Sequence, residues 1–306
     1  MDASSARSSA PASAAGGTSE PPDGAPTASP ASRVREGILY EFDEDYLDAL
    51  VDRHGGEYRT AEPFPHVVID GFLPETVASA LLDEWPDFDA IHHKTFDDRH
   101  EFKHVCSDMT LVGARIRGLL AAFNGSQFVR FLERMTGIGP LVTDPHLAAA
   151  GLFEVPPGGR LDPHTDFTQG ARTRLARRIN VLYYMNRGWR EEHGGQLELW
   201  CMNPLRCMHS IVPLFNRLVI FNTAPTALHG HPYPVAAEVP GGSRKCLSTY
   251  YFTKERPIRE ALSGRHAVVF ADDPHLRSKG RTQALWDLAA PPLVDHLRRR
   301  IRRRRR

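Results

Sequence analysis

The sequence has few of the features that mark membrane, secreted or disulfide-stapled proteins. No stretch approaches the roughly 18 uninterrupted apolar residues that a spanning helix needs. The first 35 residues lack the apolar block of a secretory signal. The four cysteines contain no CxxC pair and are too few for a disulfide scaffold. These absences predict a cytoplasmic protein whose cysteines are reduced structural thiols rather than zinc ligands.

Charge and composition separate the two ends of the chain from its middle. Residues 1–33 are mostly Ala, Ser, Pro, Gly and Thr, which predicts a disordered tail. Segment 298–306 holds eight arginines, and without them 30 basic residues face 37 acidic ones, a net charge near −7. Clustered positive charge binds polyanions, so contact with nucleic acid or an acidic surface is one interpretation of this tail, and a function-neutral tail is the other.

Residues 34–140 are expected to form an N-terminal helical support region. A short strand at 67–69 precedes a helix with one apolar face, and further helices are predicted at about 111–123 and 128–135. Ser126 is the expected N-cap of the last helix and Gly137 its end. The apolar face of the first helix consists of Val77, Leu81, Leu82 and Trp85.

The histidine-rich segment 91–104, "IHHKTFDDRHEFKH", carries His92, His93 and His104. We expect a solvated loop there, with a lid that contacts substrate as the alternative. Trp189, Trp200 and the aromatic run 250–252 are expected to pack in the core rather than stack on a substrate.

Residues 141–257 have the pattern of a β domain. Short apolar or alternating runs separated by turn residues predict a mainly β fold, a sandwich or barrel with flanking helices. A C-terminal extension, 258–297, follows, with a possible helix at 285–297 that two prolines interrupt. The expected strands include "AAAGLFEV", "INVLYYM", "QLELW", "NRLVIF" and "KCLSTYYF".

Three polar residues in this region suggest a metal site. In an extended strand, His164 and Asp166 of "PHTDF" point to the same face. His229, just past an apolar strand in "HGHPYP", can supply a third ligand, although His231 competes with it. Two histidines and one carboxylate leave coordination positions open, which suits non-haem Fe(II) chemistry with oxygen.

Five sequence blocks together resemble a known family. "PHTDF", "RRINVLYYMNRGWREEHGGQLELW", "PLFNRLVIFNT", "HGHPYPV" and "RKCLSTYYF" occur in this order within about 148–253, roughly a third of the chain. The sequence resembles the Fe(II)/2-oxoglutarate-dependent dioxygenases, in particular their prolyl 4-hydroxylase-like branch. The resemblance implies a double-stranded β-helix, also called a jelly-roll or cupin-like fold, over residues 141–257.

The resemblance also implies roles for individual residues. His164, Asp166 and His229 would be the catalytic iron ligands. Arg244 would grip the far carboxylate of 2-oxoglutarate, with Lys245 as the fallback in that register. Tyr184 would hydrogen-bond the same carboxylate, although its neighbour Tyr183 competes.

The implied cofactor is Fe(II), with 2-oxoglutarate and O2 as cosubstrates and ascorbate as a candidate reductant. The implied reaction hydroxylates an unactivated C–H bond of a prolyl residue, an amino acid or a small natural-product intermediate, while 2-oxoglutarate becomes succinate. Related halogenases replace the carboxylate ligand with a small residue, so Asp166 favours hydroxylation.

Two other classes stay open at this level. A zinc-dependent hydrolase can use the same His/Asp/His set, but it does not need a buried arginine beyond the metal. A non-catalytic β-barrel binding module would be expected to lose at least one ligand, and this chain keeps all three.

Overall fold

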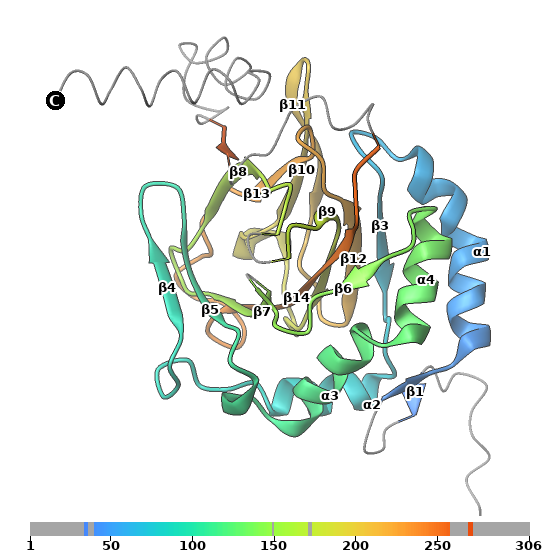
Figure 1. The fold of residues 1–306 in the computed structure, drawn as a ribbon. Coiled ribbons are helices and arrows are strands. Elements are labelled where there is room, and N and C mark those ends of the chain that lie inside the picture. The colour runs from blue at the N-terminus through green and yellow to red at the C-terminus, as the bar shows by residue number, and fades with distance from the viewer. Residues whose placement is uncertain (1–33, 36–39, 149, 171–172, 258–268, 272–306) are drawn as a thin grey trace, which may run out of the picture. The chain divides into compact units, whose positions relative to one another are not determined.

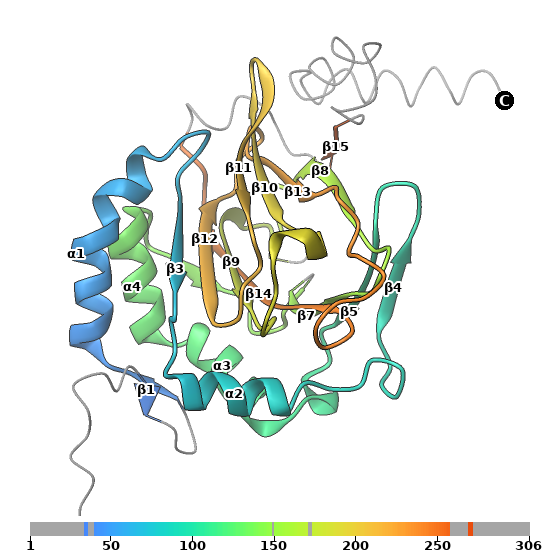
Figure 2. The ribbon, with the colours of Figure 1, turned by 180° about the vertical axis from the view of Figure 1, so that it is seen from behind.

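Two antiparallel β-sheets pack face to face in a distorted double-stranded β-helix, and helices flank the larger sheet (Figures 1 and 2). The computed structural model describes residues 34–35, 40–148, 150–170, 173–257 and 269–271, all within the compact unit Ser32–Arg306. The mainly β fold class with flanking helices is therefore confirmed.

The larger sheet has the strand order β3-β12-β9-β14-β7-β5-β4, and β6 pairs with β14. Its central strands are buried on both faces, which explains why they read as apolar runs in the sequence. The strands are β3 (His66–Asp70), β4 (Lys94–Asp97), β5 (Phe102–Cys106), β6 (Val142–Thr143), β7 (Gly151–Val155), β9 (Ala176–Tyr184), β12 (Arg217–Asn222) and β14 (Arg244–Thr253).

The smaller sheet has the order β11-β10-β13-β8-β15. Its members are β8 (Leu161–Thr165), β10 (Leu197–Met202), β11 (Leu205–Ile211), β13 (Leu228–His231) and β15 (Val269–Phe270). Leu197 and Leu199 of β10 share one apolar cluster with Tyr184, Val219 and Phe221 of the larger sheet. This shared cluster is the inner core between the two sheets.

Four α-helices accompany the larger sheet: α1 (Glu44–Thr60), α2 (Glu75–Asp83), α3 (Ala114–Phe123) and α4 (Ser126–Thr136). Helix α1 begins at the N-cap Asp43, whose carboxylate accepts a hydrogen bond from the backbone N–H of Tyr46 at 3.0 Å. Two short 3-10 helices, η1 (Met109–Leu111) and η2 (Glu191–His193), and a small pair of strands, β1 (Val34–Arg35) and β2 (Glu41–Phe42), complete the described elements.

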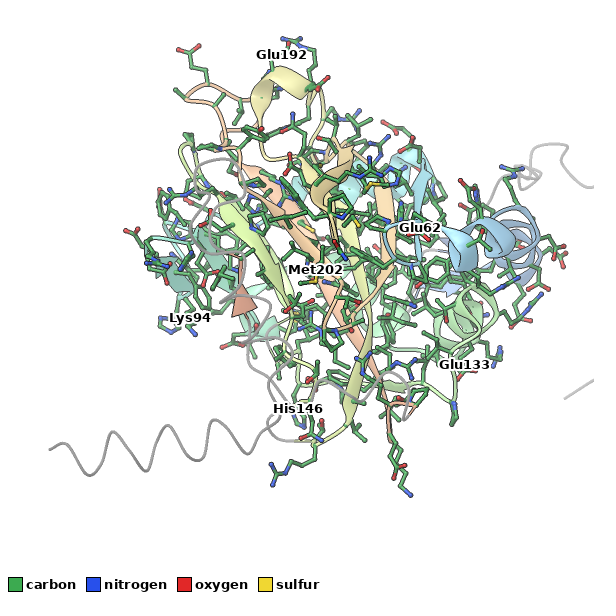
Figure 3. All side chains as sticks on the ribbon, turned by 90° about the horizontal axis from the view of Figure 1, so that it is seen from above. Glu62, Lys94, Glu133, His146, Glu192 and Met202 are labelled. Carbon is green, nitrogen blue, oxygen red and sulfur yellow. The ribbon has the colours of Figure 1, made fainter. Side chains whose placement is uncertain are left out.

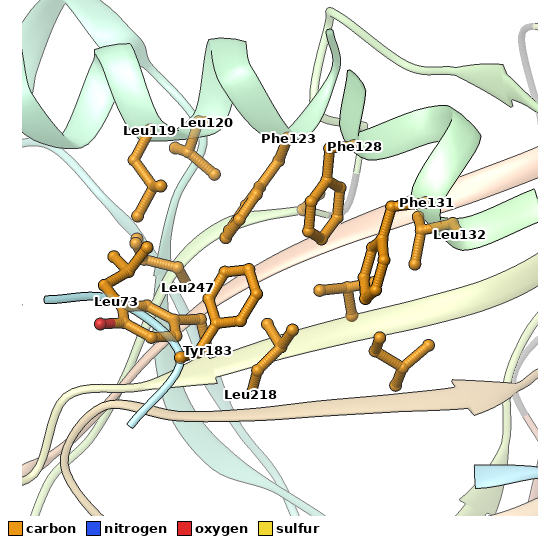
Figure 4. Packing of buried hydrophobic residues seen from close by; sticks show 14 of the residues in the cluster. Leu73, Leu119, Leu120, Phe123, Phe128, Phe131, Leu132, Tyr183, Leu218 and Leu247 are labelled. Atoms are coloured by element: carbon orange, nitrogen blue, oxygen red, sulfur yellow. The ribbon is translucent and has the colours of Figure 1, made fainter. Parts of the chain in front are cut away.

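A second apolar cluster joins the helices to the outer face of the larger sheet. Phe123 of α3 and Phe128 of α4 lie over Tyr183, Leu218 and Leu247 (Figure 4). Because side chains alternate along a strand, Tyr183 belongs to this outer core while its neighbour Tyr184 belongs to the inner one. The helical layer thereby fixes the sheet whose inner face carries part of the site described below.

The sequence predicted the central strands of the larger sheet, β10 and three of the four α-helices, but it missed or misread other elements. Helix α4 has Gly125 as its N-cap rather than Ser126, which is its first helical residue, whereas Gly137 ends it as expected, at a φ of +70°. The segment 34–140 supplies helices but also strands β3, β4 and β5 of the larger sheet. The predicted tails 1–33 and 298–306 and the predicted helix 285–297 lie outside the described residues.

The prediction of a solvated loop at 91–104 is wrong. This segment forms most of the β4–β5 hairpin, and β5 pairs with β7 through contacts such as His104 with Glu154. The strands could not be recognised in the sequence, because the face of the hairpin that the rest of the molecule covers carries polar side chains. The segment therefore lacks the alternation of apolar and polar residues that marks a strand. Trp189, Trp200 and the run 250–252 are buried, as expected.

We predict that Phe128→Ala lowers the free energy of unfolding by about 3–5 kcal/mol, because Phe128 is fully buried among other aromatic rings and the change leaves a cavity. Chemical denaturation followed by circular dichroism measures the loss. Leu111→Ala is the control, since Leu111 is 36% exposed and its truncation changes stability by about 0.5 kcal/mol or less. Equal effects of the two substitutions would contradict the assignment of Phe128 to the core.

Candidate active site

Three potential metal ligands converge at the paired strands β8 and β13. The register places His164 of β8 directly opposite His229 of β13, and Asp166 follows the end of β8. The Nε2 atoms of His164 and His229 lie 3.8 Å and 3.6 Å from the two carboxylate oxygens of Asp166. One ligand atom from each of the three residues lies within 4.8 Å of the others, and all three side chains are almost completely buried.

Backbone carbonyls orient both histidines. Nδ1 of His164 lies 3.0 Å from the carbonyl of Asp162, and Nδ1 of His229 lies 3.0 Å from the carbonyl of Ala227. A proton on each Nδ1 satisfies these contacts and leaves the Nε2 lone pairs facing Asp166, the usual arrangement of metal-binding histidines. Burial, aided by the neighbouring His229, lowers the pKa of His164 to about 3, so its ring is neutral at ordinary pH.

Arg177 of β9 holds the carboxylate of Asp166. Its Nη2 lies 2.9 Å from Asp166 Oδ2, and its guanidinium carbon lies 3.4 Å from the ring centroid of Tyr250 and 4.4 Å from that of Phe167. Burial alone would raise the pKa of Asp166, but the positive charge of Arg177 beside it opposes burial and the pKa is lowered, so Asp166 remains a carboxylate. Arg177 could not be predicted from the sequence, because neither it nor its neighbour Arg178 belongs to a motif that marks a site.

Arg244 lies at another part of the same cavity and is 4% exposed. Its Nε donates to the carbonyl of Gly195 at 2.7 Å, and its Nη2 donates to the hydroxyl of Tyr184 at 3.1 Å. Gly195 has a φ of +66°, and a Cβ there would stand 2.8 Å from Cδ of Arg244, so a glycine is needed for this close approach.

The neighbours of these two residues point elsewhere. The Lys245 ammonium donates to the carbonyl of Gly241 and to the hydroxyl of Ser243. Tyr183 donates its hydroxyl proton to Asn216 on the outer face of the larger sheet. The structure thus brings Tyr184 and Arg244 together and places Tyr183 and Lys245 away from them.

A cavity of about 350 Å³ connects the His/Asp/His group with Arg244. The inner face of the β4–β5 hairpin forms one wall, and Phe270 of β15 contributes another, in register with His164. His231 also lines the cavity, but it does not belong to the group of converging ligand atoms in the described part of the chain. Phe270 was not predicted to line a cavity, and contact of the hairpin segment with substrate was only the alternative to a solvated loop.

The donor set fits a ferrous ion. Two neutral imidazoles and one carboxylate on one side of a cavity leave coordination positions open toward that cavity. Within the described residues, Asp166 Oδ2 has no hydrogen-bond donor, since its contact with Arg177 is an ion pair without hydrogen-bond geometry. A buried carboxylate oxygen of this kind is suited to a cation. All four cysteines are unpaired, and none belongs to this group.

Comparisons with known proteins agree with this geometry. Residues 150–253 match the model of the 2OG-Fe(II) oxygenase superfamily. The chain is similar to a prolyl 4-hydroxylase from Phytophthora capsici, with a TM-score of 0.52 and 20% identity over 81% of this chain and 74% of that one. This likeness supports the fold, while the family match supports the activity. A comparison with curated proteins finds no match.

Two further solved structures are similar at lower scores. A prolyl hydroxylase from Trichoplax adhaerens, in complex with a peptide fragment of hypoxia inducible factor, has a TM-score of 0.49 and 19% identity, over 72% of this chain and 96% of that one. A prolyl 4-hydroxylase from Pseudomonas putida has a TM-score of 0.47 and 19% identity, over 68% of this chain and the whole of that one.

Residues 150–253 are thus a 2OG-Fe(II) oxygenase domain with a prolyl 4-hydroxylase-like fold. The protein is a 2-oxoglutarate-dependent dioxygenase that uses Fe(II) and O2, rather than the zinc hydrolase or the silent binding module that the sequence left open. Among the described residues, no helix is both long and apolar enough to cross a membrane.

We predict that the metal-free protein loses stability as the pH falls below about 6.5. Burial lowers the pKa of five histidines in the folded state, so the unfolded chain takes up protons first as the pH is lowered. The free energy of unfolding therefore decreases as the pH decreases. Denaturation in the presence of a chelator at about pH 7.5 and about pH 5.5 measures the change. A stability that is constant or greater at the lower pH would contradict this. The five residues are His66, His104, His164, His229 and His231.

Proposed function

We propose that the protein hydroxylates an unactivated C–H bond, with His164, Asp166 and His229 as its iron ligands. The observation that carries this proposal is a single cavity with three converging ligand atoms on one wall and a buried arginine on another. The substrate is a small molecule or a residue of a peptide, and the candidates are a prolyl residue, an amino acid or a natural-product intermediate. The cytoplasmic location and the use of ascorbate stay predictions from the sequence.

Arg244 and Tyr184 are proposed to hold the far carboxylate of 2-oxoglutarate. A guanidinium stays charged when buried and pairs with a carboxylate through two parallel hydrogen bonds. The Tyr184 oxygen accepts a hydrogen bond from Arg244, so the hydroxyl proton of Tyr184 is free to point at the cosubstrate. Burial raises the pKa of Tyr184, which keeps that proton on the oxygen.

Bound iron with 2-oxoglutarate and O2 supplies the oxidising chemistry, and the cosubstrate leaves as succinate and CO2. The chain supplies position. Arg177 fixes the carboxylate of Asp166 in one orientation, and the carbonyls of Asp162 and Ala227 fix the imidazoles.

We predict that Asp166→Ala and His229→Ala each abolish succinate production by the iron-loaded protein, because each removes a metal ligand. The same two substitutions lower iron binding, measured by metal analysis after anaerobic purification. Asp97→Ala is the control, since Asp97 is exposed on β4 and does not line the cavity. Full turnover by either ligand variant would refute the assignment. Retained iron in His229→Ala, together with its loss in His231→Ala, would move the ligand role to His231.

We predict that Arg244→Gln raises the KM for 2-oxoglutarate by about tenfold or more, because a buried charge-assisted contact is worth about 1.5–3 kcal/mol. Succinate formation at varied 2-oxoglutarate concentration measures the effect. Tyr184→Phe is expected to raise the KM less, since it removes a single hydroxyl. Lys245→Gln is the control because its ammonium points to Gly241 and Ser243. A larger effect of Lys245→Gln than of Arg244→Gln would transfer the role to Lys245.

A further inference from the structure

A pair of opposite charges lines the cavity on the inner face of the β4–β5 hairpin. Glu101, just before β5, and Lys103, within β5, are two residues apart, and both line the cavity that contains the His/Asp/His group. Their carboxylate and ammonium groups lie 2.5 Å apart, and the side chains are only 11% and 13% exposed. The pair lies outside residues 150–253, the part of the chain that matches the oxygenase family.

A buried ion pair in a cavity wall lowers the stability of the fold compared with apolar residues, so its presence points to a role in binding. Removing two charges from water is energetically unfavourable, and a cavity wall can be lined at lower cost by apolar residues. Glu101 and Lys103 satisfy each other when the cavity holds no substrate. A ligand that carries both an ammonium and a carboxylate can replace each partner in turn and leave no buried charge unpaired.

Two aromatic rings flank the ammonium of Lys103. Its ammonium lies 5.1 Å from the ring centroid of Phe96 and 5.9 Å from that of Phe153, so it is held over apolar surface inside the cavity. Lys94 lies on the same face of the hairpin, on the side of the molecule away from Glu133 of helix α4 (Figure 3). Because Lys94 is exposed, water screens its charge.

The size of the cavity agrees with this interpretation. Its volume of about 350 Å³ is near the lower end of the range for ligand sites, and 2-oxoglutarate occupies the part beside Arg244 in the proposed function. The remaining space fits a molecule of about the size of one amino acid. A peptide would have to place one residue in this space and extend outside it, and its uncharged backbone could not replace the two charges.

We propose that Glu101 and Lys103 select a free amino acid or a similar small zwitterion as the primary substrate. The substrate ammonium pairs with Glu101 and the substrate carboxylate pairs with Lys103, which presents the rest of the molecule to the His/Asp/His group. This inference rests on the proposed function and defines the substrate class of that site.

The test measures binding and uses chemically blocked ligands. The common free L-amino acids are titrated by calorimetry into the full-length protein loaded with Fe(II) and 2-oxoglutarate under anaerobic conditions. Each amino acid that binds is compared with its N-acetyl form, its carboxamide form and the doubly blocked form. We expect at least one free amino acid to bind, and each single block to weaken its binding by about tenfold or more.

Two substitutions separate recognition from a structural role. Glu101→Gln removes the discrimination against the N-acetyl form and keeps the discrimination against the carboxamide. Lys103→Met does the reverse. If the pair only held the hairpin in place, each substitution would weaken the binding of all forms alike, and that result would overturn the proposal. Asp97→Asn on the other face of β4 and Lys254→Met, which is exposed, are the matched controls and keep the wild-type pattern.

The remaining outcomes also decide. If doubly blocked amino acids or blocked peptides bind as tightly as the free amino acids, the substrate is peptidic and the proposal is wrong. The proposal is also wrong if no amino acid binds while the iron-loaded protein still binds 2-oxoglutarate and Arg244→Gln loses that binding. In this case the proposed function stands. Failure of the protein to bind 2-oxoglutarate at all would overturn both.

Discussion

The antiparallel pairing of β8 with β13 is the constraint on which the candidate active site depends. This pairing sets His164 directly opposite His229, so two residues 65 positions apart in the sequence become neighbours on one face of the smaller sheet. A shift of the register by one residue would turn one imidazole to the other face and separate the pair. The rest of the molecule keeps this register, because the inner core packs the smaller sheet against the larger one.

Buried arginines supply the second level of organisation. Arg177 and Arg244 both come from central strands of the larger sheet and reach into the space between the sheets. Each is held by fixed partners. Arg177 forms an ion pair with Asp166 and lies over the ring of Tyr250. Arg244 donates hydrogen bonds to the carbonyl of Gly195 and the hydroxyl of Tyr184. The two positive charges thus have defined positions before any ligand binds, which reduces the reorganisation that binding requires.

The sequence predicted the parts of the molecule in which local pattern and final structure agree. Central strands such as β9 are buried on both faces, so their apolar runs were readable, and the resemblance pointed to the same residues that converge in the structure. Helix α1 was missed because its polar face and its two glycines, Gly55 and Gly56, weaken the helical pattern, and tertiary packing of Leu47, Leu50 and Tyr58 stabilises it instead. The β4–β5 hairpin was missed because its charged residues face a cavity, which no local pattern can reveal. Arg177 was missed because its partner Asp166 follows β8 of the smaller sheet, so only the packing of the two sheets brings the pair together.

The contact between Arg177 and Asp166 has a consequence for the charge of the proposed metal centre. The guanidinium offsets the negative charge of Asp166, the one anionic candidate ligand, and the two other candidates are neutral imidazoles. A divalent cation held there would therefore keep most of its positive charge instead of having it cancelled by the protein. That residual charge would attract a doubly negative cosubstrate, so loading with metal should come before tight binding of the dianion. The cosubstrate, rather than the protein, would then neutralise most of the charge of the bound cation.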